Sequence, residues 1–252
     1  MLASSETNVS VGLWNVAWAR GATRQGEYFA KHLAADDVVC LTEAHTDVLS
    51  GGHQITSSAD YGYNSTTDRR KVVLWSRHEW RIVDHVGSPH FPPGRFVSGI
   101  TNTRCGDIRF IGVCIPWRDA HVSTGRRDRR PWDDHLTFLR HLKPVLMSHA
   151  DVPTIVLGDF NQRIPRTHQP PQVFGALMSA LESFRVVTAG PLFGFPALLI
   201  DHLAVSGPLT PTRVDFLSNL DSSGTRVSDH FGLRVLLCWA CPASSTTAIS
   251  QR

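Results

Sequence analysis

The chain has 252 residues, of which 42% are hydrophobic and 19% are charged, and its formal net charge at neutral pH is +3. This composition is typical of a globular protein with a substantial core, and so small a net charge excludes a protein that coats nucleic acid through bulk positive charge. Because the sequence has no run of about 18 apolar residues and no basic segment followed by an apolar one at its start, we expect no membrane insertion and a cytoplasmic location.

The first third of the chain is predicted to form a strand, a helix and a second strand. Residues 9–14 are an apolar strand that ends on Asn15, and residues 22–33 have the apolar spacing of an amphipathic helix. Asn15 suits a turn and is also a neutral oxygen ligand. The apolar strand at 38–41 is followed two residues later by Glu43. A carboxylate there needs a cation or hydrogen-bond donors, unless Glu43 faces water at the rim.

The middle third is predicted to be a series of strands. Residues 51–70 are rich in Gly, Ser, Thr, Asn and Asp, which predicts a loop. We expect residues 72–75 and 80–86 to form paired strands around a turn, followed by strands at 96–103 and 108–115. Such a meander, between a strand-helix-strand segment and a helix-strand segment, predicts two packed sheets with helices outside them.

An arginine-rich segment follows Pro116. Its charged residues are Arg118, Arg126, Arg127, Arg129 and Arg130 with Asp119 and Asp128. A charge run is most often a solvated loop, but beside a carboxylate-lined strand end it would attract and hold a phosphate group. From Pro131 to Leu146, apolar residues spaced three to four apart predict a helix, in which Pro144 would introduce a kink.

A Gly-Asp-Phe-Asn motif follows the short apolar strand predicted at residues 154–157. Gly158 frees the backbone to turn. The spacing of two places Asp159 and Asn161 on one side of the chain, while Phe160 faces the other. Together they could hold a metal, activate water or orient an oxyanion. The alternative is a turn in which both residues bond their own backbone.

The last third alternates helix and strand. The expected elements are a helix at 172–184, a strand at 185–188, a strand at 197–200 that ends in Asp201 and His202, and a strand pair around Ser228-Asp229-His230 whose second strand is 231–239. We expect one domain over residues 9–241, a flexible start at 1–8 and a disordered tail at 242–252. The Cys238-x-x-Cys241 spacing has no second pair, which disfavours a metal or redox role.

Polar groups therefore recur at predicted strand ends. They are Asn15, Glu43, Asp159, Asn161, Asp201, Asp229 and His230. Each has an ordinary structural explanation alone, but burial penalties argue against so many at one edge without a cation. Because the ligands are oxygen donors and zinc-type Cys and His pairs are absent, Mg²⁺ or Mn²⁺ is the favoured ion.

Five of these segments also carry a family resemblance. They are, in order, Trp14-Asn15, Leu41-Thr-Glu43, Gly158-Asp-Phe-Asn161, Ile200-Asp201-His202 and Ser228-Asp-His230. In this order they resemble the motifs of the endonuclease/exonuclease/phosphatase superfamily, which includes deoxyribonuclease I, exonuclease III-type repair enzymes, sphingomyelinases and inositol polyphosphate phosphatases. The resemblance covers nearly the whole chain. It implies a four-layer α/β sandwich, with two packed mixed sheets between helices, and metal-dependent hydrolysis of phosphate esters.

The resemblance also implies a role for each residue. Glu43 would be the principal metal carboxylate, helped by Asn15 and Asp229. Asp159 would position or deprotonate the attacking water, and Asn161 would hold that water or a phosphate oxygen. His230 would contact the phosphate while Asp201 orients its imidazole.

Two positions depart from the family pattern. Many of its nucleases have an Asp where this chain has Ala17, and a Tyr or His where it has Cys114. We expect Trp117 and Arg118 to take over part of the missing phosphate contact, with Arg126 and Arg127 also binding substrate.

The sequence thus predicts a metal-dependent phosphodiesterase, most simply a nuclease that acts on nucleic acid, with no obligate protein partner evident. The alternative enzyme is a phosphomonoesterase or a lipid-headgroup phosphodiesterase, which needs a deep pocket where a nuclease needs an open basic groove. A non-catalytic binding domain is the alternative from another class, although retention of the central acids argues against it. A serine hydrolase is excluded, because Ser228, Asp229 and His230 are adjacent in sequence and no G-x-S-x-G motif exists.

Overall fold

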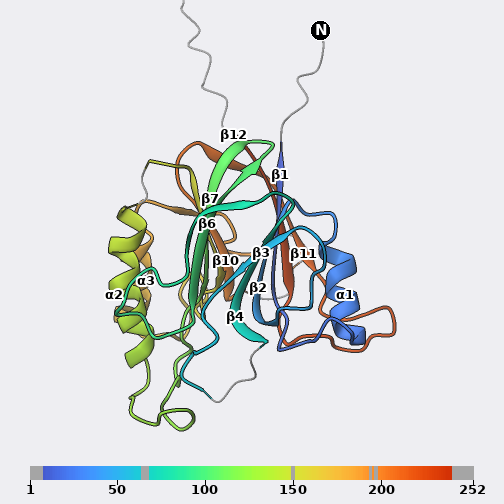
Figure 1. The fold of residues 1–252 in the computed structure, drawn as a ribbon. Helices are drawn as coiled ribbons and strands as arrows, with labels where there is room; N and C mark the ends of the chain where they lie inside the picture. The colour runs from blue at the N-terminus through green and yellow to red at the C-terminus, as the bar shows by residue number, and fades with distance from the viewer. Residues whose placement is uncertain (1–7, 64–67, 149–150, 193–194, 196–197, 240–252) are drawn as a thin grey trace, which may run out of the picture.

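Two six-stranded sheets pack face to face between helices in this computed structural model, which describes residues 8–63, 68–148, 151–192, 195 and 198–239. Seen edge-on, α2 and α3 lie outside one sheet and α1 lies outside the other (Figure 1). The predicted four-layer α/β sandwich is confirmed. No helix in the described ranges is long and apolar enough to cross a bilayer. Apart from Asn8, the segments predicted to be flexible at 1–8 and disordered at 242–252 lie outside the described residues.

The first sheet has the strand order β11-β12-β1-β2-β4-β3. Its strands are β1 (Val9–Asn15), β2 (Val38–His45), β3 (His53–Thr56), β4 (Arg69–Ser76), β11 (Leu209–Leu217) and β12 (Gly232–Trp239). β1 and β2 are parallel, and α1 (Arg24–Leu33) connects them. Phe29 and Leu33 of this helix pack against Trp14 and Leu41, so the sheet is covered on its outer face.

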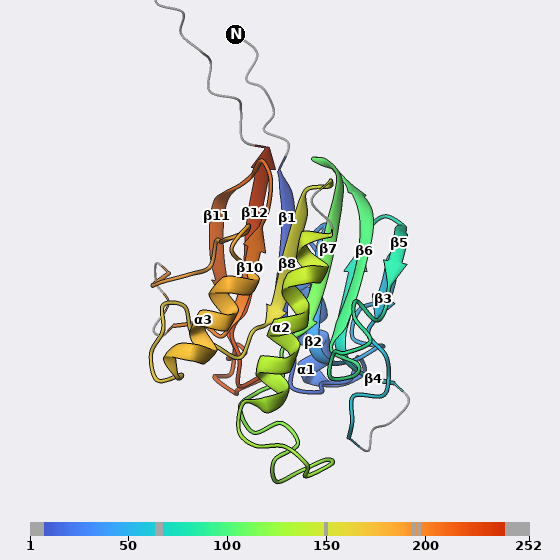
Figure 2. The same ribbon diagram turned by 90° about the vertical axis from the view of Figure 1, so that its left-hand side faces the viewer.

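The second sheet has the order β5-β6-β7-β8-β10-β9. Its strands are β5 (Trp80–Asp84), β6 (Phe96–Thr103), β7 (Gly106–Cys114), β8 (Thr154–Asp159), β9 (Arg185–Val186) and β10 (Asp201–Val205). The helices α2 (Asp133–Met147) and α3 (Pro171–Ala180) lie across its outer face (Figure 2). Because each sheet is covered on both faces, central strands such as β8 are apolar throughout rather than alternating.

Three strand assignments from the sequence are wrong. The strands predicted at 72–75 and 80–86 do not pair, because β4 and β5 belong to different sheets and the turn between them carries the chain across. The predicted loop at 51–70 contains β3, whose side chains are exposed or half-buried and so leave no apolar signal. No strand covers residues 198–200, and β10 instead begins at Asp201.

The start of β10 matters because this strand runs antiparallel to β8. The register places Asp201 opposite Asp159, the last residue of β8. In the first sheet, β12 runs antiparallel to β1, so the turn before Gly232 returns to the end of β1 at Asn15. Strand ends and strand starts thus meet at one edge of the sandwich, which the local sequence pattern does not reveal.

Gly158 makes the turn at this edge possible. Its φ is +140°, and a Cβ atom there would lie 1.8 Å from the carbonyl oxygen of Val113 on the paired strand β7. A backbone atom cannot move aside as a flexible side chain can, so only glycine fits at this position.

We predict that Gly158→Ala lowers the free energy of unfolding by at least about 3 kcal/mol, since strain and a backbone clash act together. The matched control is Gly175→Ala in α3, where a Cβ atom has no neighbour within 4 Å. That substitution should be neutral or stabilise by about 0.5–1 kcal/mol. Denaturant unfolding of both variants tests this, and equal stabilities would contradict the assigned role of Gly158.

Candidate active site

Asp159 is the buried carboxylate at the end of β8. Its Oδ1 accepts a hydrogen bond from the backbone N–H of Asn161 at 2.9 Å, so Asp159 bonds its own turn as the alternative predicted, whereas the side chain of Asn161 donates to the carbonyl oxygen of Ile115 instead. Its Oδ2 also accepts from Nδ2 of Asn15, on β1 of the other sheet, at 3.3 Å. Phe160 points the opposite way into the core beneath α2 and α3. The carboxylate therefore joins the two sheets as well as shaping its own turn.

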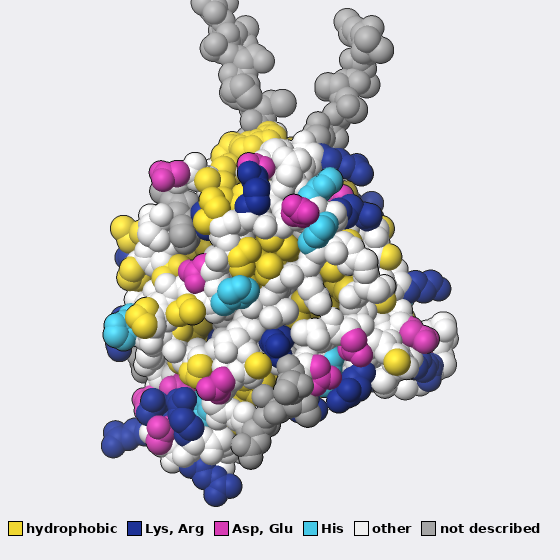
Figure 3. Space-filling model, in the orientation of Figure 1, with side chains coloured by type: hydrophobic (Ala, Val, Ile, Leu, Met, Phe, Trp, Pro, Cys, Tyr) yellow, Lys and Arg dark blue, Asp and Glu magenta, His cyan; other side chains and the backbone are white. Residues whose placement is uncertain are grey.

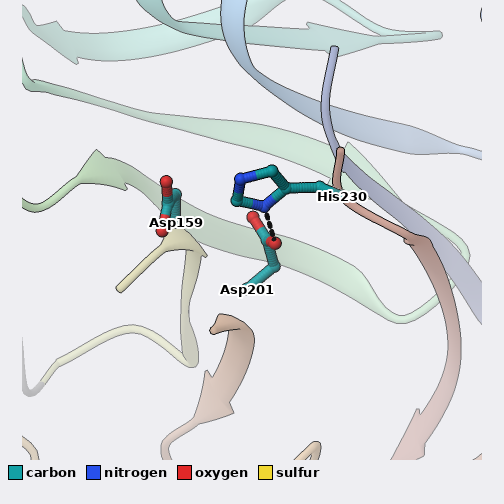
Figure 4. A group of neighbouring side chains, drawn as sticks. All are labelled: Asp159, Asp201 and His230. Atoms are coloured by element: carbon teal, nitrogen blue, oxygen red, sulfur yellow. Dashed lines mark hydrogen bonds and ion pairs between the residues drawn. The ribbon is translucent and has the colours of Figure 1, made fainter. Parts of the chain in front are cut away.

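His230 and Asp201 form a close pair beside Asp159. Nδ1 of His230 lies 2.5 Å from Oδ2 of Asp201, and the imidazole ring faces the side on which Asp159 lies (Figure 4). One ligand atom from each of these three residues lies within 4.8 Å of those of the other two. The other carboxylate oxygen of Asp201 is buried and has no hydrogen-bond partner among the described residues. This site is rich in negative charge and is incompletely satisfied by the protein alone.

The backbone of His230 is fixed by residues that sequence reasoning did not single out. Nε1 of Trp14 donates to the carbonyl oxygen of His230 at 3.0 Å. Oγ of Ser228 accepts from the backbone N–H of His230 at 3.1 Å and donates to the carbonyl oxygen of Asn15 at 2.7 Å. Trp14 and Ser228 belong to two of the motifs named above. Their positions directly before Asn15 and Asp229 could have identified them.

The pKa values of Asp159 and His230 are both raised, for different physical reasons. Burial, followed by the neighbouring charge of Asp201, raises the pKa of Asp159 to about 7. Burial alone would lower the pKa of His230, but the charge and hydrogen bond of Asp201 outweigh it and raise the pKa to about 10. At neutral pH His230 is therefore an imidazolium. A protonated imidazole cannot bind a metal, so His230 is suited to hydrogen bonding with an anion instead.

Glu43 lies inside β2 and not after it, as the sequence analysis had placed it. Its φ of +49° is unusual for a strand residue with a side chain. Nζ of Lys71, on the adjacent strand β4, donates to Oε1 of Glu43 at 2.6 Å. Lys71 is buried and went unnoticed in the sequence. Its position as the last of three basic residues, directly before the apolar strand segment 72–75, could have been its signal.

The remaining predicted metal ligands lie at different depths. Asn15 is buried, and its Oδ1 accepts from the backbone N–H of Ala17 at 3.1 Å. The negative charge of Glu43 contributes to the raised pKa of Asp159, so the two carboxylates are close enough to interact. Asp229 is exposed, and its charge acts on His230. Carboxylate and amide oxygens of this kind fit a hard divalent cation.

The arginine-rich loop is partly a structural network. Arg126 and Arg129 both form ion pairs with the buried carboxylate of Asp134 at the start of α2. In Figure 3, basic and acidic side chains intermingle at the corner of the molecule where this loop lies. Among the described residues, the side chains of Arg127 and Arg130 form no ion pair, and Arg118 pairs with the neighbouring Asp119 at 3.5 Å. Trp117 is 44% exposed beside the loop.

The two departures from the family pattern have different environments. Ala17 is exposed and has a left-handed backbone with φ of +48°. Cys114 is buried at the end of β7, and burial raises its pKa to about 12. A thiol that stays neutral and enclosed packs beneath the site and does not contact phosphate as a Tyr or His would.

Comparison with known proteins places these residues in a family. The model described as the Endonuclease/Exonuclease/phosphatase family matches residues 12–230, which include all seven candidate residues of the strand-end constellation. No curated protein sequence matches the chain. The family match supports hydrolysis of phosphate esters as the class of activity.

Solved structures share the fold at low sequence identity. An endonuclease/exonuclease/phosphatase from Beutenbergia cavernae is 17% identical with a TM-score of 0.62, covering 92% of this chain and 72% of its own. A humanized TDP2 from D. rerio is 14% identical with a TM-score of 0.66, covering 91% and 98%. The 3′ phosphatase NExo from Neisseria, bound to a product DNA hairpin, is 17% identical with a TM-score of 0.63, covering 90% and 98%.

The raised pKa of Asp159 gives a test of the site's electrostatics. A carboxyl whose pKa rises from 3.8 in the unfolded chain to about 7 in the folded protein stabilises the fold only while protonated. Stability is therefore lost as the pH rises toward and through 7, by up to about 4 kcal/mol. Asn cannot titrate. In chelator, we predict that the melting temperature of Asp159→Asn relative to wild type increases between pH 5 and pH 8.

Thermal melts across this pH range measure the effect. The control is Asp151→Asn, which removes an exposed carboxylate. Its melting temperature relative to wild type should not change with pH. The same flat response in Asp159→Asn would show that burial and neighbouring charges do not raise the pKa of the Asp159 carboxyl.

Proposed function

The chain belongs to the endonuclease/exonuclease/phosphatase family, and on that premise we propose that it is a divalent-metal-dependent phosphodiesterase that acts on nucleic acid. The observation that carries this proposal is His230, paired with Asp201 and held close to the buried Asp159. An acid group and a base group held side by side at a cleft are what hydrolysis of a phosphate ester requires.

Each residue then has a chemical task. The His230 imidazolium donates its Nε2–H to a phosphate oxygen, while Asp201 accepts from its Nδ1–H and fixes the orientation of the ring. Asp159, whose pKa of about 7 is close to the working pH, orients the attacking water and accepts its proton. Asn161 donates its side-chain amide to the carbonyl oxygen of Ile115 at 2.9 Å, which leaves its oxygen for the water or the phosphate.

The oxygen donors Asn15 and Glu43 would hold Mg²⁺ or Mn²⁺, with Asp229 at the exposed rim. When bound, such an ion supplies Lewis-acid stabilisation of negative charge on the phosphate. Lys71 neutralises part of the Glu43 charge in the protein itself. The sequence-predicted roles of Trp117, Arg118, Arg126 and Arg127 in substrate binding stay proposals. So does the cytoplasmic location.

Hydrolysis of a phosphomonoester at a DNA end is the alternative. The solved Neisseria neighbour is a 3′ phosphatase bound to a product DNA hairpin, and this chain has the same fold. The same acid, base and metal ligands would serve either reaction. The two are separated by whether the substrate must be an internal diester or a terminal phosphate.

We predict that hydrolysis requires added Mg²⁺ or Mn²⁺. A site built from carboxylate and amide oxygens binds hard cations, and removing the ion leaves its negative charge uncompensated. Purified protein should be assayed on single-stranded DNA, duplex DNA, RNA, a 3′-phosphorylated oligonucleotide and an inositol phosphate. Full turnover in excess chelator after dialysis would contradict the metal requirement, and activity on the inositol phosphate alone would contradict the nucleic-acid assignment.

The His230 and Asp201 pair allows a second test. We expect His230→Ala to reduce the rate by about 10²- to 10⁴-fold, and Asp201→Asn to reduce it in the same direction. Because Asp201 acts through the imidazole, the double variant should be no slower than His230→Ala. Steady-state rates and thermal melts of all three variants are needed. If the two losses multiply while folding is intact, Asp201 acts independently of His230.

A further inference from the structure

A cavity lined by aromatic and basic side chains lies next to Glu43. Its volume is about 330 Å³, and its principal lining residues are Trp18, Tyr61, Tyr63, Arg69, Lys71 and Trp117. None of these except Trp117 belongs to the residues singled out from the sequence. The cavity is open to solvent and lies close to the lower end of the size range of small-molecule sites.

The cavity is joined to the active site through Lys71. Its Nζ donates to Oε1 of Glu43 and also lies 4.9 Å from the ring centroid of Trp18 and 5.3 Å from that of Tyr61. The guanidinium of Arg69 lies 5.1 Å from the Trp18 ring. Lys71 and Arg69 thus place two cations beside the Trp18 ring. Lys71 also bonds Glu43, the predicted metal carboxylate.

The backbone holds Trp18 in place at a cost. Ala17 and Trp18 are consecutive residues with positive φ, +48° and +63°, which side-chain-bearing residues rarely adopt. The strain is offset by hydrogen bonds from the Ala17 N–H to the Asn15 side chain and from the Trp18 N–H to the carbonyl oxygen of Glu43 at 2.6 Å. Because Asn15 and Glu43, both of the candidate active site, hold this strained backbone in place, we infer that the position of Trp18 serves the function of the site.

The rings form a platform rather than a core cluster. Trp18 stacks on Tyr61 with centroids 5.6 Å apart and planes 20° apart, and Tyr61 is buried beneath it. Trp18 itself is half-buried, and Trp117 is 44% exposed at the same cavity. Aromatic faces accept any nucleobase by stacking, and the neighbouring cations attract its phosphate.

We propose that this cavity binds the unpaired nucleobase next to the scissile phosphate, so that the enzyme prefers single-stranded or frayed ends. The proposal rests on the phosphodiesterase function above and names its substrate class. A paired base cannot enter a cavity of this kind without leaving its helix. An inositol phosphate would require more cations than rings, and a lipid would require a larger apolar surface.

The test uses single-stranded oligonucleotides in which one base at a time, at successive positions, is replaced by an abasic analogue. For the wild-type protein we expect one position where loss of the base lowers kcat/KM about 10- to 100-fold, the range of a single base stacking on an aromatic residue. Trp18→Ala should reduce this ratio to near one, and Trp18→Phe should retain most of it. Trp117→Ala is a second variant if Trp18→Ala does not fold.

Trp239→Leu is the matched control, since Trp239 is 38% exposed at the far end of β12 from His230. It should leave the ratio unchanged. Binding of the same labelled oligonucleotides in chelator, followed by fluorescence anisotropy, separates the two proposals. Base-dependent binding that Trp18→Ala abolishes, with no hydrolysis after Mg²⁺ or Mn²⁺ is added, would support the cavity and refute the phosphodiesterase. The cavity proposal alone would be overturned if no abasic position lowered kcat/KM. It would also be overturned if an abasic position lowered kcat/KM equally in wild type, Trp18→Ala and Trp239→Leu.

Discussion

Two buried carboxylates facing each other across one strand pair are the constraint on which the active site depends. Asp159 and Asp201 occupy paired positions on β8 and β10, and each is less than 5% exposed. Burial and the like charge of Asp201 disfavour ionisation of Asp159. His230 relieves the conflict on one side by pairing with Asp201, which leaves Asp159 with the raised pKa. The proposed acid, His230, and the proposed base, Asp159, therefore both depend on the position of Asp201 between them.

That arrangement also explains why the two sheets meet where they do. Asn15 of the first sheet donates to Asp159 of the second, and Ser228 ties the His230 turn to the carbonyl oxygen of Asn15. These bonds satisfy polar groups that the apolar core between the sheets could not. On the neighbouring strands β2 and β4, the Lys71 cation pairs with the Glu43 carboxylate, as His230 pairs with Asp201. Asp201 and the half-buried Glu43 thus each have one cationic partner, whereas no ion pair is recorded for Asp159 among the described residues.

Sequence reasoning identified the acids and the His230 partner of Asp201, but not Lys71, the partner of Glu43. Asp159 follows an apolar run that only a buried strand explains, so its place at the edge was predictable. Asp201 was expected at the end of a strand and instead begins one, because the direction of β10 is set by its pairing with β8. Lys71 meets Glu43 only through the register of β2 with β4, and Arg129 meets Asp134 only once its loop folds back on α2. Such contacts depend on pairing, which local periodicity does not encode.

Backbone strain provides an independent indication of where function lies. Among the described residues, eight non-glycine positions have positive φ, and Ile82 on β5 is the one outside the candidate site, its adjoining cavity and the loop that precedes α2. Glu43 and Asn161 belong to the candidate site, Trp18 lines the cavity and follows Ala17, and the other three positions belong to the loop that precedes α2. Each such position costs on the order of 1–3 kcal/mol, which a protein selected for stability alone would avoid. The strain fixes the direction of each side chain before substrate arrives, and electrostatic stabilisation of a phosphate depends on groups that need not reorient during the reaction. Under the proposed function, the left-handed residues are the means by which two rigid sheets place the groups that receive one phosphate.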